Sequence, residues 1–278
     1  MTGYLIYDVF TDRRFGGNQL AIIPDARDLP EVELQAITRE FGFSETVFLF
    51  PPEDPAHSAR VRIFTPTMEV PFAGHPTIGT AVMLADAGLG PDMMLELGIG
   101  PLQARAADGR ASFTTTHALK RLAAPETALV AEALGIPPGA ITARPVMASL
   151  GLGFTLTPVA SREVLAACQP DTAAFRRGAE AHPEGLDFAQ YVYVEEEGVI
   201  HARMFAPLDD IPEDPATGSA AATLGALMAE IADADVSLTI HQGEDMGRPS
   251  VIGVEAAHDG AVTVSGAAVL VMQGELVR

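Results

Sequence analysis

The chain has 278 residues, of which 48% are hydrophobic and 19% are charged, a balance typical of a folded protein and unlike a disordered one. Its 17 basic and 37 acidic residues give a formal net charge of −20, and no basic stripe offsets it, so we expect no binding to nucleic acid or to anionic membranes. The single cysteine, Cys168, excludes an internal disulfide and a cysteine-based metal site.

The N-terminal stretch MTGYLIYDVF has no basic segment and reaches Asp8 early, which is unlike a signal peptide. The best candidate for a membrane span is interrupted by Glu230. We therefore expect a soluble, cytoplasmic protein.

The first half is predicted to combine short strands with two helices. Strands are expected at 4–10, 20–23, 46–50, 61–65, 93–97, 102–106 and 111–115, and helices at 31–41 and from about Pro76 to Gly88. The second helix is apolar on every face, which predicts that it is fully buried. His75 lies near its cap and Pro76 at its first position. The unpaired N–H groups and the positive dipole end at this start predict an anion site.

The second half repeats this composition after a predicted crossover at 117–127. Strands are expected at 145–149, 154–158, 190–194, 201–205, 236–241, 250–254, 261–264 and 267–272, and helices at 128–134, 163–168, 172–178 and 219–231. The last helix is rich in Ala and Gly, so strands can pack closely around it. We predict an α+β fold of two halves, 1–117 and 118–278, each a barrel-like sheet around a buried helix.

An internal repeat supports this division. The stretches RIFTPTMEVP from Arg62 and RMFAPLDDIP from Arg203 agree at seven of ten positions, identical or conservative, with one offset: 203 − 62 = 141 and 212 − 71 = 141. Three further residues follow the second proline in the second copy, which aligns Ala73-Gly74-His75 with Thr217-Gly218-Ser219. The repeat predicts a duplicated unit whose two helix starts share one cleft.

A weaker echo lies upstream of each copy. FSETVFL from Phe43 matches FAQYVYV from Phe188 at an offset of 188 − 43 = 145. In this alignment the counterpart of Glu45 is Gln190, so only the first half would carry a carboxylate there.

Three side chains are candidates for proton transfer: Glu45, His75 and Asp214. Glu45 lies among apolar residues in FSETVFLF, where a raised pKa would suit an acid/base, although a surface glutamate at a strand start is the plain alternative. His75 could donate to a substrate oxygen or move a proton, but an isolated histidine near a helix start is more often a cap or a packing residue. Asp214, in EDPATGS, could simply cap the turn before the second central helix.

Backbone N–H groups of Gly74, Gly218 and Ser219 suit a substrate carboxylate or a developing enolate. The weaker candidates for ligand contact are Asn18, Gln242 and Arg248. We predict no metal site.

Five blocks of the sequence resemble those of the PhzF-type phenazine-biosynthesis family, which is similar in fold to diaminopimelate epimerase and proline racemase. They are DVFTDRRFGGNQLAII, FGFSETVF, RIFTPTMEVPFAGHPTIGTA, RMFAPLDDIPEDPATGSAAA and QGEDMGRPS, in order from Asp8 to Ser250. The resemblance implies two pseudo-symmetric halves with the active site between them, a homodimer, no cofactor, and a final strand able to return to the first half. It also implies Glu45 as the catalytic acid/base, His75 in the site, and Asp214 as a substrate-orienting or auxiliary acid group.

Two-base epimerases of this fold use a thiol at the start of each central helix. Here those positions are Ala73 and Thr217, and Cys168 lies outside both blocks, so racemisation by paired thiols is excluded. We therefore expect a cofactor-independent isomerase in which Glu45 shifts a proton on a small carboxylate-bearing metabolite. Two alternatives stay open: a two-base epimerase that uses Glu45 and Asp214, and a non-catalytic metabolite- or partner-binding protein on the same scaffold.

Overall fold

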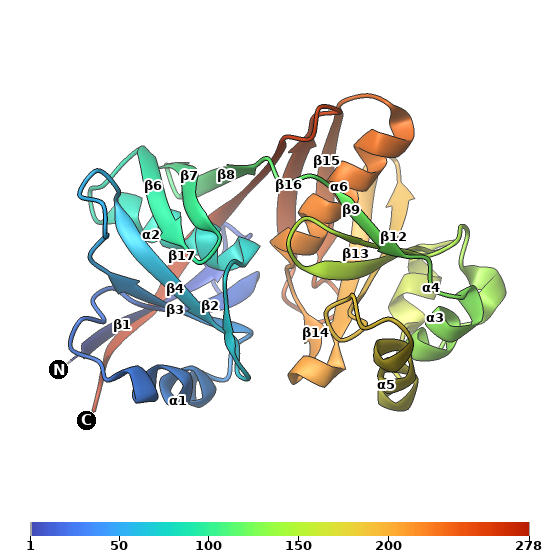
Figure 1. Cartoon of the computed structure of the whole chain (residues 1–278), viewed down its shortest axis with the longest axis horizontal. Helices are drawn as coiled ribbons and strands as arrows, with labels where there is room; N and C mark the ends of the chain where they lie inside the picture. The colour runs from blue at the N-terminus through green and yellow to red at the C-terminus, as the bar shows by residue number, and fades with distance from the viewer. Residues whose placement is uncertain (1, 278) are drawn as a thin grey trace. The chain divides into compact units, whose positions relative to one another are not determined.

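The computed structural model describes residues 2–277, which form two compact units. Unit 1 comprises residues 2–115 and 263–277, and unit 2 comprises residues 116–262. The last strand therefore belongs to the unit that contains the first strand, and Figure 1 shows the two side by side in blue and red. Within residues 2–277, every helix is too short or too polar to cross a lipid bilayer.

Unit 1 is a ring of strands around a helix. Its elements are β1 (Thr2–Val9), β2 (Asn18–Ile23), α1 (Glu31–Phe41), β3 (Glu45–Phe50), β4 (Ala59–Phe64), β5 (Glu69–Val70), α2 (Gly74–Asp86), β6 (Asp92–Leu97), β7 (Gly100–Ala107), β8 (Arg110–Thr115) and most of β17 (Val262–Leu276). Neighbours pair in the order β8, β7, β6, β4, β3, β2, β1, β17, and β17 returns to β8. Only β2–β3 and β4–β6 are parallel among the pairs with a defined register.

Helix α2 fills this ring, as its apolar composition predicts. Residues 74–84 are all buried, and the helix packs against β1, β2, β3, β7 and β8. Close approach depends on Gly79, because a Cβ there would lie 2.5 Å from Leu20 Cδ2 and 2.8 Å from Val9 Cγ2. The helix begins at Gly74, two residues before the predicted start. Pro76 is its third residue, which is tolerated because the N–H groups of the first turn make no intrahelical bond.

Unit 2 repeats this plan with more helices outside the sheet. Its elements are β9 (Lys120–Ala123), α3 (Thr127–Leu134), β10 (Val146–Ser149), β11 (Gly153–Pro158), α4 (Arg162–Ala167), α5 (Thr172–Ala181), β12 (Gln190–Glu196), β13 (Val199–Ala206), β14 (Ile211–Asp214), α6 (Gly218–Ala232), β15 (Val236–Gln242) and β16 (Ser250–Ala256), with short 3-10 turns at Pro138–Ala140 and Pro207–Asp209. The parallel pairs β11–β12 and β13–β15 correspond to β2–β3 and β4–β6 of unit 1. Helix α6 packs against β10, β11, β15 and β16 (Figure 1). The predicted α+β fold with one buried helix in each half is confirmed.

Two predicted segments differ from the structure. The stretch 117–127 was expected to be a crossover, but it contains β9, which pairs antiparallel with β10. Lys120 and Arg121 are both exposed, so this strand lacks the alternation of apolar and polar residues by which strands are predicted from sequence. Its pairing with β10 is made by main-chain groups. The two strands expected near the end form one strand, β17. Gly266 does not break it, and a Cβ at that position would lie 2.3 Å from Phe10 Cδ1.

Strand register also places the insertion in the repeat more exactly than the sequence alignment does. On β4, Ile63 pairs with Val70, and its repeat partner on β13, Met204, pairs with Asp214. Val70 therefore corresponds to Asp214, at an offset of 214 − 70 = 144, and the predicted match of Val70 with Ile211 is wrong. The three extra residues precede β14, in the turn that includes Pro207–Asp209.

A pair of equivalent ion pairs supports the corrected alignment. Arg62 Nε donates to Glu69 Oε1 over 2.8 Å, and Arg203 Nε donates to Glu213 Oε1 over 2.8 Å. Glu69 thus corresponds to Glu213, again at an offset of 144, and not to Asp210.

Candidate active site

Glu45 and His75 meet at the start of the central helix of unit 1. Glu45 is the first residue of β3, and His75 is the second residue of α2. Glu45 Oε2 lies 3.4 Å from His75 Nδ1, and the two side chains are 16% and 3% exposed. A glutamate and a histidine that are 30 positions apart in sequence are therefore neighbours, and both side chains are largely buried.

Asn18 orients the imidazole of His75. Its Nδ2 lies 3.3 Å from His75 Nδ1, and its Oδ1 accepts a hydrogen bond from Ser44 Oγ over 3.1 Å. Because the Ser44 hydroxyl takes Oδ1, the amide NH₂ points at the ring, so Nδ1 acts as an acceptor and the ring proton is assigned to Nε2.

Burial keeps this imidazole neutral. His75 is 3% exposed, and desolvation lowers its pKa to about 3, while a smaller effect of the main chain at Gln19 acts in the opposite direction. A ring with this pKa carries no charge at neutral pH. It can accept a hydrogen bond at Nδ1 or donate one at Nε2, but it is a poor base.

The start of α2 has the main-chain character of an anion site. Ala73 is the N-cap residue, with extended backbone and no side-chain capping bond, and Gly74 and His75 are buried. The first N–H groups and the positive end of the dipole lie beside the Glu45–His75 pair. Ala73 occupies the position where two-base epimerases of this fold carry a thiol, and its methyl group cannot move a proton.

Asp214 belongs to a separate buried network in unit 2, at the start of α6. Its Oδ2 accepts a hydrogen bond from Thr217 Oγ1 over 2.5 Å, and its main-chain oxygen accepts one from Gln242 Nε2 over 2.8 Å. Gln242 Oε1 also accepts a hydrogen bond from the main-chain N–H of Thr217 over 3.2 Å. This network fixes the first turn of α6, where Gly218 and Ser219 are the first two helical residues.

The remaining thiol is remote from both helix starts in sequence and unreactive in its surroundings. Cys168 follows α4, is buried, and its Sγ donates to Val164 O over 3.5 Å. Burial raises the pKa of this thiol to about 11. With Thr217 at the second thiol position, the side chains present cannot support catalysis by paired thiols.

Strand pairing shows how β3 and β12 correspond. Arg62 pairs with Phe48 of β3, and its repeat partner Arg203 pairs with Val192 of β12. Phe48 therefore corresponds to Val192, at an offset of 192 − 48 = 144, one less than the sequence alignment gives.

This register changes the counterpart of Glu45. At an offset of 144 it is Ala189, and the predicted counterpart Gln190 is wrong by one residue. A shift of one residue in a strand places a side chain on the opposite face, and the amide of Gln190 donates to Phe188 O over 2.7 Å instead. Unit 2 thus has neither a carboxylate nor an amide at the position of Glu45.

Sequence reasoning missed two polar groups near these sites. The Ser44 hydroxyl donates a hydrogen bond to Asn18 Oδ1. Its place directly before Glu45 in the sequence could have indicated that it lies near the site. The hydroxyl of Tyr191 is fully buried and has no hydrogen-bond partner within residues 2–277, and burial, with the Asp214 carboxylate second, raises the pKa of Tyr191. Tyr191 and Asp214 both pair with Met204 of β13, but an aromatic residue in a strand gives no sign of this.

Two weaker candidates are also located. Gln242 ends β15 and joins the Asp214 network. Arg248 lies in the loop before β16, where its main-chain N–H donates to Gly243 O over 3.0 Å.

Comparison with known proteins agrees with this architecture. The model of the phenazine biosynthesis-like protein family matches residues 7–274. An uncharacterized isomerase of Mesorhizobium japonicum is 39% identical, with 98% of each chain covered. A trans-2,3-dihydro-3-hydroxyanthranilate isomerase of Pseudomonas fluorescens is 32% identical, covering 92% of this chain and 91% of that protein. Among solved structures, a predicted epimerase of Pseudomonas aeruginosa is similar with a TM-score of 0.86 and 30% identity over the whole of both chains. The chain belongs to the phenazine biosynthesis-like protein family, and it is an isomerase.

Proposed function

We propose that this isomerase shifts a proton on a small carboxylate-bearing metabolite, without a cofactor, and that Glu45 is its acid/base. The observation that carries the proposal is the contact of 3.4 Å between Glu45 Oε2 and His75 Nδ1 at the start of α2. It places a carboxylate beside main-chain N–H groups suited to an anion. The name of the related trans-2,3-dihydro-3-hydroxyanthranilate isomerase supports an unsaturated ring acid as the substrate class.

The proposed reaction needs one base and one anion site. Glu45 removes a proton from a carbon next to the conjugated system, and the C–H electron pair moves into that system. The N–H groups of Gly74 and His75 hold the substrate carboxylate and stabilise the charge that develops. Glu45, now protonated, returns the proton to a different carbon. One C–H bond breaks and another forms, so no electron donor or acceptor is required.

His75 assists as a neutral group in this scheme. Nδ1 has one lone pair, so it can receive a hydrogen bond from the protonated form of Glu45 only when that bond replaces the one from Asn18 Nδ2; the exchange stabilises the acid that returns the proton. Asn18 keeps the ring in that orientation. His75 is therefore a partner of the acid/base rather than a second base.

Replacing the carboxylate tests the proposal. Wild type, Glu45→Gln and Glu45→Asp are incubated in deuterated water with trans-2,3-dihydro-3-hydroxyanthranilate and with a panel of small unsaturated carboxylic acids, and deuterium uptake is followed by proton NMR. We expect Glu45→Gln to lose turnover and exchange by about 10² to 10⁴-fold, and Glu45→Asp to keep part of both. Glu40→Gln, an exposed change on α1, is the matched control and should behave as wild type. Full exchange by Glu45→Gln would refute the role of Glu45.

Epimerisation is the second candidate, favoured by the similar structure named a predicted epimerase. In that case Asp214, which is 5% exposed, acts as a second acid/base group. The two reactions leave deuterium in different places. A proton shift labels a carbon that carried no exchanging proton in the substrate, whereas epimerisation labels and inverts a single carbon. Loss of inversion in Asp214→Asn, with exchange at that carbon retained, would favour epimerisation.

A further inference from the structure

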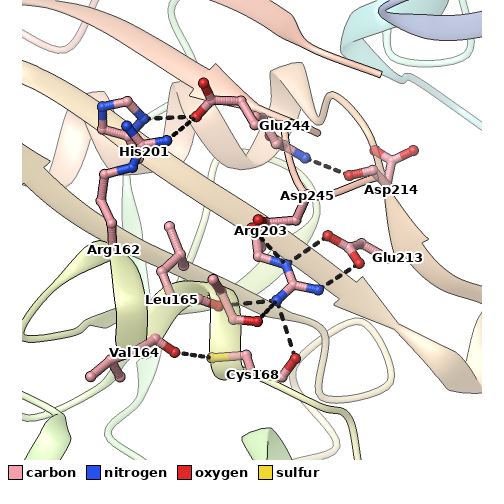
Figure 2. A network of polar contacts seen from close by, with 12 residues as sticks. Arg162, Val164, Leu165, Cys168, His201, Arg203, Glu213, Asp214, Glu244 and Asp245 are labelled. Atoms are coloured by element: carbon pink, nitrogen blue, oxygen red, sulfur yellow. Dashed lines mark hydrogen bonds and ion pairs between the residues drawn. The ribbon is translucent and has the colours of Figure 1, made fainter. Parts of the chain in front are cut away.

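Two histidines and a glutamate converge on unit 2, outside the groups assigned to isomerisation. His201 of β13 and His241 of β15 are directly paired in the register of these parallel strands, and their ring centroids lie 5.4 Å apart. Glu244 follows β15, and its Oε2 lies 2.9 Å from His201 Nδ1 (Figure 2). One ligand atom from each of the three residues lies within 4.8 Å of the other two.

We propose that His201, His241 and Glu244 bind a divalent transition-metal ion of the zinc, nickel or copper class. Two imidazoles with one carboxylate form a ligand set that such ions favour, whereas magnesium and calcium prefer oxygen ligands. His201 Nδ1 and Glu244 Oε2 are already 2.9 Å apart, and all three ligand atoms lie within 4.8 Å of one another, so rotation of the side chains can bring them around one ion. Because both histidines lie on paired strands, two of the three ligands are already held in place.

A cavity beside the cluster supports an open coordination position. It has a volume of about 230 Å³ and is bordered by Arg162 and Leu165 of α4, by His201, and by Glu244 and Asp245. The cavity borders two of the three ligands, His201 and Glu244, whose side chains are 11% and 36% exposed, and it does not border His241. Three protein ligands then leave room for water or for a small ligand.

Arg162 forms an ion pair with the Glu244 carboxylate. Its Nη2 lies 2.9 Å from Glu244 Oε2, the same oxygen that faces His201, and Figure 2 shows both side chains pointing at it. The Arg162 side chain is 45% exposed and can move into solvent. A guanidinium and a metal ion compete for one carboxylate, so binding of the ion displaces Arg162.

The cluster lies on the opposite face of β15 from the α6 network. His241 and Gln242 are neighbours on this strand, so their side chains point to opposite faces, and Gln242 bonds Asp214 and Thr217. The three proposed metal ligands are therefore distinct from the groups assigned to isomerisation, although Asp214 belongs to the same network of polar contacts as Glu244 and Asp245 (Figure 2).

Metal titration of the full chain tests this site. After treatment with a chelator, binding of zinc, nickel and cobalt chlorides is measured by isothermal titration calorimetry, and the cobalt complex by its visible spectrum. We expect one ion per chain, at least tenfold weaker binding in His201→Gln, His241→Gln and Glu244→Gln, and several-fold tighter binding in Arg162→Gln. Magnesium chloride should give no heat. His258→Ala, which removes an exposed histidine paired with Asp235, is the matched control and should bind as wild type.

Several results would overturn the assignment. They are no binding at millimolar metal, affinity unchanged in both histidine variants, or affinity unchanged in both Glu244→Gln and Arg162→Gln. Circular dichroism checks that each variant is folded, and the Arg162→Gln result keeps the test decisive even if a histidine variant does not fold, because it predicts a gain of affinity.

Discussion

At the scale of single residues, the chemistry of unit 1 depends on a neutral histidine. His75 is enclosed by the strands around α2, and burial lowers its pKa to about 3. The sequence predicted that His75 belongs to the site, but it left open whether the ring carries a proton, because desolvation is a property of the folded neighbours. Asn18 and Ser44 then fix which nitrogen accepts.

This burial predicts a pH dependence of stability. The unfolded chain takes up a proton at this histidine near pH 6.5, whereas the folded chain does not until about pH 3, so the folded state binds fewer protons between these values and stability falls as pH falls. From pH 7 to pH 5 the free energy of unfolding should drop by about 2 kcal/mol through this residue alone. Urea unfolding of wild type and His75→Gln at both pH values measures it, and an equal drop in both proteins would contradict the prediction.

At the scale of elements, the two central helices are placed by small residues. In α6 a Cβ on Gly225 would lie 2.5 Å from Val254 Cγ1, just as one on Gly79 of α2 would lie 2.5 Å from Leu20 Cδ2. Composition predicted both helices and their burial, since a helix without a polar stripe has no face to offer water. Composition does not predict which glycine of each helix packs against which strand.

Adding one methyl group to these helices should destabilise the protein. We expect Gly225→Ala to lower the free energy of unfolding by about 1 to 3 kcal/mol, because Val254 must move, although alanine is the better helix former. Val254→Ala in the same chain should recover part of the loss. Gly139→Ala, where a Cβ meets no atom within 4 Å, is the control. Thermal unfolding of the four proteins checks this, and equal stability of Gly225→Ala and wild type would count against close packing.

At the scale of the whole molecule, the duplication was evident in the sequence, but its register was not. Identities around Arg62 and Arg203 revealed the repeat, whereas strand pairing located the three-residue insertion before β14 and moved the counterpart of Glu45 to Ala189. Short matches between strands tolerate a slip of one residue, and only the hydrogen-bonded ladder removes that ambiguity. Association into a homodimer stays a prediction.

The path of β17 predicts an unequal response to truncation. β17 pairs with β1 from Thr2↔Leu276 to Val9↔Ala268, so deleting the chain from Gly266 onward leaves β1 with β2 as its remaining strand partner. We expect unit 1 to lose protection against hydrogen exchange and limited proteolysis, while unit 2, which ends at Val262, keeps its own. Removing only the two residues after Leu276 leaves that pairing intact and is the control. Unchanged protection of β1 to β4 in the longer deletion would contradict this prediction.

The sequence by itself determined the fold class, the two buried helices, the repeat, the absence of thiols at both helix starts, and Glu45, His75 and Asp214 as candidates. The helices and the repeat follow from local composition and spacing, whereas the thiol positions and the choice of Glu45 follow from the resemblance of five sequence blocks to a known family. Tertiary structure decided which candidates touch: Glu45, His75 and Asn18 in unit 1, Asp214, Thr217 and Gln242 in unit 2, and the His201–His241–Glu244 cluster. Such contacts join residues tens of positions apart through strand register and burial, and neither is encoded in any single stretch of the chain.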